Sequence, residues 1–212
     1  MTKSHFDLFF RKHYNNVKNY SKLDFEDKSK YIFYSELLNK KGPKYSKIFK
    51  SEKDSISEYT SHQPSSIELF DVLKKLSIYP SDKILDIGCG KGFALAIMNL
   101  FPFKKIAGLE ISKDLCKISK NNLEKLSINQ IDIFNNDALS FKQYSNYNMF
   151  YLYNPFSNQI LKEVVEKITL PNSTLIFCNI SPENYKTLLE NSFEFNFAYE
   201  GVIIDFNIFK KI

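Results

Sequence analysis

The central feature of the sequence is Lys83-Ile84-Leu85-Asp86-Ile87-Gly88-Cys89-Gly90-Lys91-Gly92, which holds three of the six glycines of the chain. Its first half, Lys83 to Ile87, is apolar apart from Lys83 and Asp86 and predicts a buried strand. The residues from Phe93 to Phe101 have the apolar spacing of a helix. Glycines between a strand and a helix let the backbone pass close to a ligand. The stretch therefore predicts a ligand-binding strand–loop–helix unit.

Helical and strand patterns alternate on both sides of this unit. The further strands are expected at 106–110, 131–134, 148–153 and 173–178, and the further helices at 65–76, 112–126, 160–168 and 182–189. Two alternating segments, 193–199 and 202–209, are linked by Glu200-Gly201 and predict an antiparallel hairpin. The predicted fold class is α/β, with a doubly wound, seven-stranded, mostly parallel sheet that ends in this hairpin.

The charge of the chain divides it into two regions. The first 57 of its 212 residues carry 13 basic and 7 acidic side chains, and the rest carry 16 and 17. Helical spacing of aromatic residues predicts that residues 1–57 form a helical extension, with 58–212 as the main domain. Every basic residue except Arg11 is lysine. This pattern is typical of a solvated surface, and an anionic partner such as nucleic acid is the alternative.

The loop has the spacing G-x-G-x-G. A nicotinamide-binding fingerprint places its third glycine where this chain has Phe93, which argues against an oxidoreductase. The segment from Ile84 to Gly92 instead resembles the first motif of the class I S-adenosylmethionine (SAM)-dependent methyltransferases. The resemblance covers about residues 58–212, because further motifs of that family follow in the same order.

This resemblance implies SAM as the cofactor and assigns a set of residues to it. Glu110 would hold the ribose hydroxyls and Asp137 the adenine amino group. A surface carboxylate and a turn cap are the alternative interpretations of these two acids. The segment Tyr59 to Ser65 resembles an entry that lies over the methionine end of the cofactor. The full candidate set is Tyr59, Asp86, Gly88, Cys89, Gly90, Glu110, Ile111, Asn136, Asp137, Ala138 and Asn154.

The end of the 148–153 strand is the expected place for the methyl acceptor. Asn154-Pro155-Phe156 resembles a shortened form of the Asn-Pro-Pro-Tyr/Phe motif of amino-group methyltransferases, in which the asparagine and the first proline position the target. Asn154 and Pro155 are therefore the candidate substrate-positioning residues, and a simple turn at the strand end is the alternative. Asparagine is not a general base. His62 is a candidate base, although a lone histidine is more often a surface residue.

These features predict an enzyme that methylates an oxygen or nitrogen nucleophile of a small molecule, a saccharide or a protein. The alternatives are a nucleic-acid amino-group methyltransferase, a nicotinamide oxidoreductase and a non-catalytic SAM-fold module. The three widely spaced cysteines fit no metal or disulfide framework. No signal peptide or membrane-length apolar run is evident, so we expect a cytoplasmic protein without a membrane partner.

Overall fold

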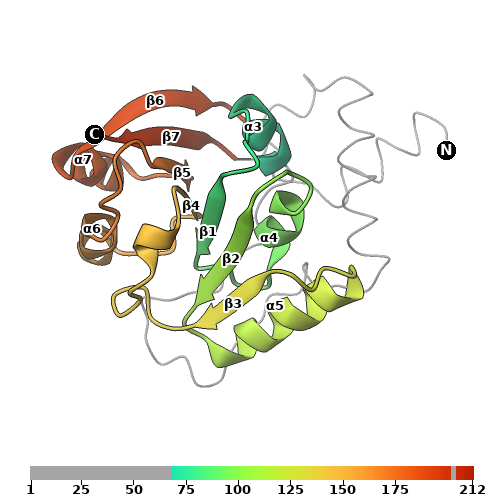
Figure 1. Cartoon of the computed structure of the whole chain (residues 1–212). Helices are drawn as coiled ribbons and strands as arrows, with labels where there is room; N and C mark the ends of the chain where they lie inside the picture. The colour runs from blue at the N-terminus through green and yellow to red at the C-terminus, as the bar shows by residue number, and fades with distance from the viewer. Residues whose placement is uncertain (1–67, 202–203) are drawn as a thin grey trace, which may run out of the picture.

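The computed structural model describes residues 68–201 and 204–212, which form one seven-stranded sheet with helices on both faces (Figure 1). The strands are β1 (Lys83–Ile87), β2 (Lys105–Glu110), β3 (Asp132–Asn135), β4 (Met149–Leu152), β5 (Thr174–Cys178), β6 (Phe193–Tyr199) and β7 (Phe206–Lys211). Their order is β3-β2-β1-β4-β5-β7-β6. The first five run parallel, and β7 is antiparallel to both of its neighbours. The predicted fold class is confirmed.

The helices divide between the two faces of the sheet (Figure 1). They are α3 (Leu69–Lys75), α4 (Phe93–Met98), α5 (Lys113–Lys125), the 3-10 helix η2 (Tyr144–Asn146), α6 (Asn158–Glu166) and α7 (Pro182–Glu190). Neighbouring strand residues point to opposite faces. Ile84 accordingly packs with α3 and α4, whereas Leu85 packs with α6 and α7. Burial on both faces explains why the central strands are apolar along their whole length.

Strand β1 lies where the sheet reverses its direction of winding. It pairs with β2 on one side and with β4 on the other, so Asp86 lies opposite both Gly108 and Tyr151. The loops that follow β1 and β4 leave the sheet at the same carboxyl edge. Ligands of doubly wound sheets bind at this kind of edge. The topology thus brings the glycine loop and Asn154 to one place.

The hairpin and the first described helix differ from the predicted ranges. Strand β7 begins at Phe206 and not at residue 202. Ile204 donates its backbone N–H to the side chain of buried Glu68, so this N–H is not available to a ladder with β6. Helix α3 begins at Leu69, and the first residues of the helix predicted over 65–76 lie outside the described residues.

The predicted extension, residues 1–57, also lies outside the described residues, together with Tyr59 and His62. The domain division and the roles given to those two side chains stay predictions. None of the helices in the described part of the chain is long and apolar enough to cross a bilayer.

Candidate cofactor and acceptor site

The glycine loop has a left-handed backbone at all three of its glycines. The φ angles are 84° at Gly88, 51° at Gly90 and 83° at Gly92, and Gly92 is the residue that caps α4. Residues other than glycine are generally strained in this left-handed backbone conformation, because they carry a Cβ. The amides of Gly88 and Cys89 both donate to the Leu109 carbonyl, at 2.8 and 3.0 Å. The loop is therefore bound to the end of β2.

The loop is tightly packed at its two ends and open at its centre. A Cβ built on Gly88 would lie 3.1 Å from the Cβ of Pro155. A Cβ built on Gly92 would collide with the Oγ of Ser119 on α5. A Cβ built on Gly90 would meet no atom of the described residues within 4 Å. The open space at Gly90 is where a ligand could approach the backbone.

Glu110 connects this loop to the start of α5. Its Oε2 accepts the N–H of Gly90 at 3.0 Å, and its Oε1 accepts the N–H of Ser112 at 2.9 Å. The side chain is only 8 % exposed. Each carboxylate oxygen has two acceptor positions, so an oxygen that accepts a backbone N–H is also able to accept a hydroxyl group. Glu110 lies where the sequence predicts a ribose ligand, and its bonds to the loop could not be foreseen from the sequence.

Asp86 brings a second carboxyl group to this region and is 2 % exposed. Burial raises its pKa well above the ordinary value, and the nearby Glu110 raises that pKa further. Two neighbouring buried carboxyl groups favour a cationic ligand, because a positive charge stabilises both of their ionised forms. SAM carries a sulfonium and an amino group. The two acidic side chains, Asp86 and Glu110, therefore fit the positive charges of this cofactor.

The predicted adenine segment follows β3 and is bonded to the same strand end. Asn136 donates its backbone N–H to the Glu110 carbonyl at 3.1 Å. Asp137 is partly exposed, and its Oδ1 accepts the N–H of Leu139 at 2.9 Å, which caps the turn. The Ala138 carbonyl accepts from the hydroxyl of Tyr144. Asp137 thus caps the turn with one oxygen and has a second oxygen for an adenine amino group.

Two further predicted cofactor residues adjoin these groups. Cys89 is buried, and a Cβ built on Gly108 would lie 2.6 Å from its Sγ. Burial, followed by the charges of Asp86 and Glu110, raises the pKa of this thiol well above its ordinary value. Cys89 consequently remains a protonated packing residue. Ile111 is 37 % exposed directly after β2, where an apolar surface is available to a ligand.

Asn154 has a left-handed backbone at φ 39° directly after β4. Asparagine tolerates this conformation better than most residues. Its Oδ1 accepts a hydrogen bond from the Nδ2 of Asn184 on α7, at 3.0 Å. Asn184 is 4 % exposed and was not among the predicted site residues. It lies 30 positions along the chain, and a polar residue in the first turn of a helix carries no signal of such a contact.

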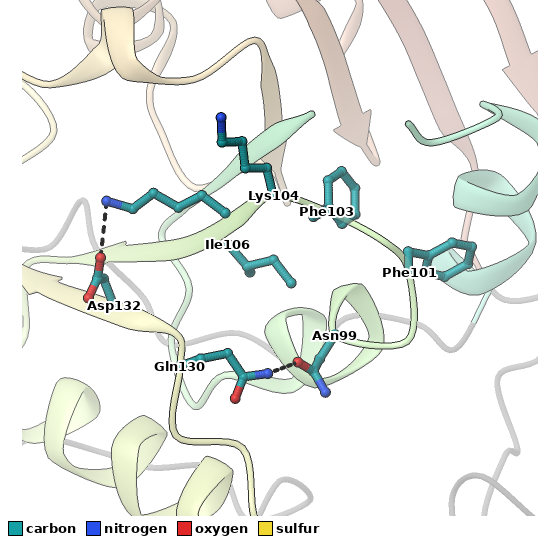
Figure 2. A pocket seen from close by; sticks show the side chains of 8 residues that line it. Asn99, Phe101, Phe103, Lys104, Ile106, Gln130 and Asp132 are labelled. Carbon is teal, nitrogen blue, oxygen red and sulfur yellow. Dashed lines mark hydrogen bonds and ion pairs between the residues drawn. The ribbon is translucent and has the colours of Figure 1, made fainter. Parts of the chain in front are cut away.

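A cavity of about 280 Å³ lies at the opposite edge of the sheet (Figure 2). Its lining comes from the amino ends of β2 and β3 and from the segment after α4. The Nζ of Lys105 pairs with Asp132 at 3.1 Å, and Gln130 donates to Asn99 at 2.6 Å. This cavity is separate from the glycine loop, which leaves the carboxyl edge. It contributes nothing to the candidate site.

The fold, the glycine loop and the two buried carboxyl groups define a SAM-dependent methyltransferase of class I. The model of the family "Protein-L-isoaspartate(D-aspartate) O-methyltransferase (PCMT)" matches residues 45–166, which is more than half of the chain. The chain belongs to this family. Its membership decides against the nicotinamide oxidoreductase.

Similar proteins act in different reactions. A probable cobalt-precorrin-6B C(15)-methyltransferase (decarboxylating) of Methanococcus vannielii is 26 % identical over 66 % of this chain and 76 % of its own length. An rRNA adenine N-6-methyltransferase of Limosilactobacillus reuteri is 30 % identical over 66 % of this chain, which spans about half (52 %) of that relative.

The crystal structure of an RNA methyltransferase from Salinibacter ruber with S-adenosyl-L-homocysteine has a TM-score of 0.55 and 15 % identity. The alignment covers 68 % of this chain and 91 % of that one. At this identity the likeness concerns the fold. The family model and the two curated relatives identify the class of reaction, methyl transfer, and leave the methyl acceptor open.

Proposed function

We propose that this protein transfers a methyl group from SAM to an oxygen nucleophile, and that this nucleophile is a carboxylate of a protein or small molecule. The observation that carries the proposal is the hydrogen bond from Asn184 to the Oδ1 of Asn154. The bond takes one of the two acceptor positions of the atom that would receive a target amine. The Nδ2 of Asn154 has no partner among residues 68–201 and 204–212, so the side chain offers a donor.

A donor suits a carboxylate, because ionised carboxyl groups only accept hydrogen bonds. When bound, SAM supplies an activated methyl group, which passes to the nucleophile as its carbon–sulfur bond breaks. Alignment of the two reactants is then the main task of the protein. The contact between Gly88 and Pro155 places the glycine loop and the Asn154 turn side by side. The Asn154 amide would hold the acceptor oxygen there.

The proposal also removes the need for a general base. A carboxylate is already ionised at neutral pH, whereas a hydroxyl has to lose its proton. Tyr153 adjoins Asn154, and burial raises the pKa of its hydroxyl to about 12, so it does not act as a base at neutral pH. The side chains bonded around Asn154 are amides and a threonine hydroxyl.

Methylation of a nucleic-acid amino group is the second candidate. It is favoured by the Asn154-Pro155-Phe156 motif and by the similarity to an rRNA adenine N-6-methyltransferase. A target amine would have to share the Oδ1 of Asn154 with Asn184. The carboxylate is therefore the better match to the described geometry.

Tritium-labelled methyl-SAM distinguishes the two candidates. The full chain is incubated with a peptide that contains an L-isoaspartyl residue and, separately, with an adenine-containing RNA oligonucleotide. We expect label in the peptide that mild base releases as volatile methanol, since methyl esters hydrolyse and methylamines do not. The same peptide with a normal asparaginyl residue is the control. Base-stable label in the RNA, with none in the peptide, would contradict the proposal.

A further inference from the structure

Four hydrogen-bonded polar side chains form a row from Asn154 across α7 to α6. The Nδ2 of Asn184 donates to the Oδ1 of Asn154 at 3.0 Å. The Nδ2 of Asn158 donates to the Oδ1 of Asn184 at 3.4 Å and also to the hydroxyl of Thr187. Asn184 and Thr187 are 4 % and 6 % exposed. The two residues on α7 are therefore withdrawn from water, and buried polar groups of this kind are nearly always hydrogen-bonded.

A backbone group at the Asn158 end of this row bears on the direction of the hydrogen bonds. The Nδ2 of Asn158 also donates to the backbone carbonyl of Glu183, at 3.3 Å. A carbonyl can only accept, so Asn158 has to present its NH2 group on this side. The two hydrogens of this NH2 group are shared among three acceptors, one of which is the oxygen of Asn184, and Asn184 presents its own NH2 group to Asn154. As a consequence, Asn154 accepts through Oδ1.

The backbone of α7 holds Asn184 in place. Its N–H donates to the Oγ of Ser181, which caps the helix, at 3.1 Å. Pro182 occupies the first turn, where its fixed φ suits a helix start. Asn184 is thus held by its main chain and by both polar atoms of its side chain. Such a residue has little freedom to rotate when a ligand arrives.

We propose that Asn184 is a positioning residue for the methyl acceptor. By donating to Oδ1 it sets the orientation of the Asn154 amide, so that Asn154 meets the acceptor with its Nδ2 donor. This inference rests on the proposed function, because it gives Asn154 the acceptor as its ligand. It adds that the choice between a donor and an acceptor at residue 154 is made by a side chain on α7 that need not touch the substrate.

The variant Asn184→Asp tests this directly. Aspartate has nearly the same shape, and it still accepts from Asn158, but its second oxygen cannot donate. The Asn154 amide then has to turn and donate its own Nδ2 to residue 184. In ¹H–¹⁵N spectra of the SAM-free protein we expect the side-chain resonances of Asn154 to shift and their hydrogen exchange to slow. The resonances of Asn158 should change less.

Activity gives an independent readout. For the isoaspartyl peptide we expect kcat to fall on the order of tenfold or more in Asn184→Asp, because misalignment acts on the chemical step. SAM affinity by calorimetry should stay within about twofold, since none of the hydrogen bonds of Asn184 in the described part of the chain reaches the glycine loop. Asn184→Ala removes both bonds and should also lower kcat, which covers the case in which the aspartate variant does not fold.

Gln159→Glu is the matched control. It makes the same amide-to-carboxylate change on an exposed residue of α6 next to Asn158. It should keep both the Asn154 resonances and kcat. Unchanged Asn154 resonances in Asn184→Asp, or equal losses of kcat in Gln159→Glu, would overturn the inference. If the wild-type protein methylates no carboxylate probe, the proposed function fails, and the Asn154 resonances alone decide whether Asn184 orients that amide.

Discussion

Asp86→Asn should strongly lower the affinity for SAM and at the same time make the unliganded protein more stable at neutral pH. The carboxyl group of Asp86 is buried beside Glu110, and both the burial and the negative charge of Glu110 oppose its ionisation. Asparagine has nearly the same shape without the charge. When a cationic ligand loses its charged partner, the binding free energy weakens by about 3 kcal/mol, which is on the order of 100-fold in affinity. Isothermal titration with SAM measures the first effect, and thermal unfolding measures the second.

The stability effect has a defined dependence on pH. The folded pKa of Asp86 is raised, so the folded state holds this proton in a range of pH where the unfolded chain has released it. Wild-type stability therefore falls as pH rises from the ordinary aspartate pKa to the folded pKa, and the Asn variant lacks this fall. The two proteins should unfold alike in acid and diverge toward neutral pH.

The control for Asp86→Asn is Glu163→Gln, a neutralised carboxylate on an exposed position of α6. It should leave both SAM affinity and the pH profile unchanged. If Asp86→Asn binds SAM with the wild-type affinity, the assignment of Asp86 to the cofactor site is wrong. A variant that is less stable than the wild type at neutral pH would show that the ionised carboxylate is stabilised in the fold.

Glu110→Gln should weaken both the fold and SAM binding. The carboxylate accepts N–H groups from Gly90 and Ser112, on two different segments. Glutamine can accept one of them, and its NH2 group then faces the other donor. An unpaired amide at this 8 % exposed position should cost about 3 kcal/mol of unfolding free energy, measured by denaturant titration. Calorimetry should show an accompanying loss of SAM affinity, because the loop loses its connection to α5.

The exposed Glu124 on α5 provides the comparison for this variant, as Glu124→Gln. It should match the wild type in both measurements. If Glu110→Gln loses SAM binding but keeps the wild-type unfolding free energy, the two backbone bonds contribute nothing to stability. If it keeps SAM affinity, the ribose assignment of Glu110 is wrong.

The elements around the glycine loop could be predicted because each has a local cause. Strand β1 was predicted with the bounds that the structure has, since a short apolar run ends at glycines. The start of the helix predicted over 112–126 was also confirmed, because the Oγ of Ser112 accepts the N–H of Leu115 and caps α5. The start of β7 could not be predicted in this way. It depends on Glu68, which is 136 positions away from Ile204 in the chain.

The candidate site shows the same division between local and distant causes. Motif spacing brought Asp86, Glu110 and Asn154 to one sheet edge, and the structure places all three there. The contacts that orient them come from other segments. Asn184 and Ser112 are small polar residues near helix starts, where they are common for reasons of capping alone. Only the packing of α7 against α6 and the strand end gives Asn184 its partner.

The contact of Gly88 with Pro155 has a consequence for how the binding of one ligand affects the binding of the other. These residues belong to the cofactor loop and to the acceptor turn, and the gap between them has no room for a methyl group without a shift. A displacement of the loop by the bound cofactor would therefore press on the turn. Such coupling is reciprocal by thermodynamic linkage, so we expect SAM and the acceptor each to change the affinity of the other by the same factor. The small size of the residue at position 88 thus leads us to expect cooperative binding of the two ligands.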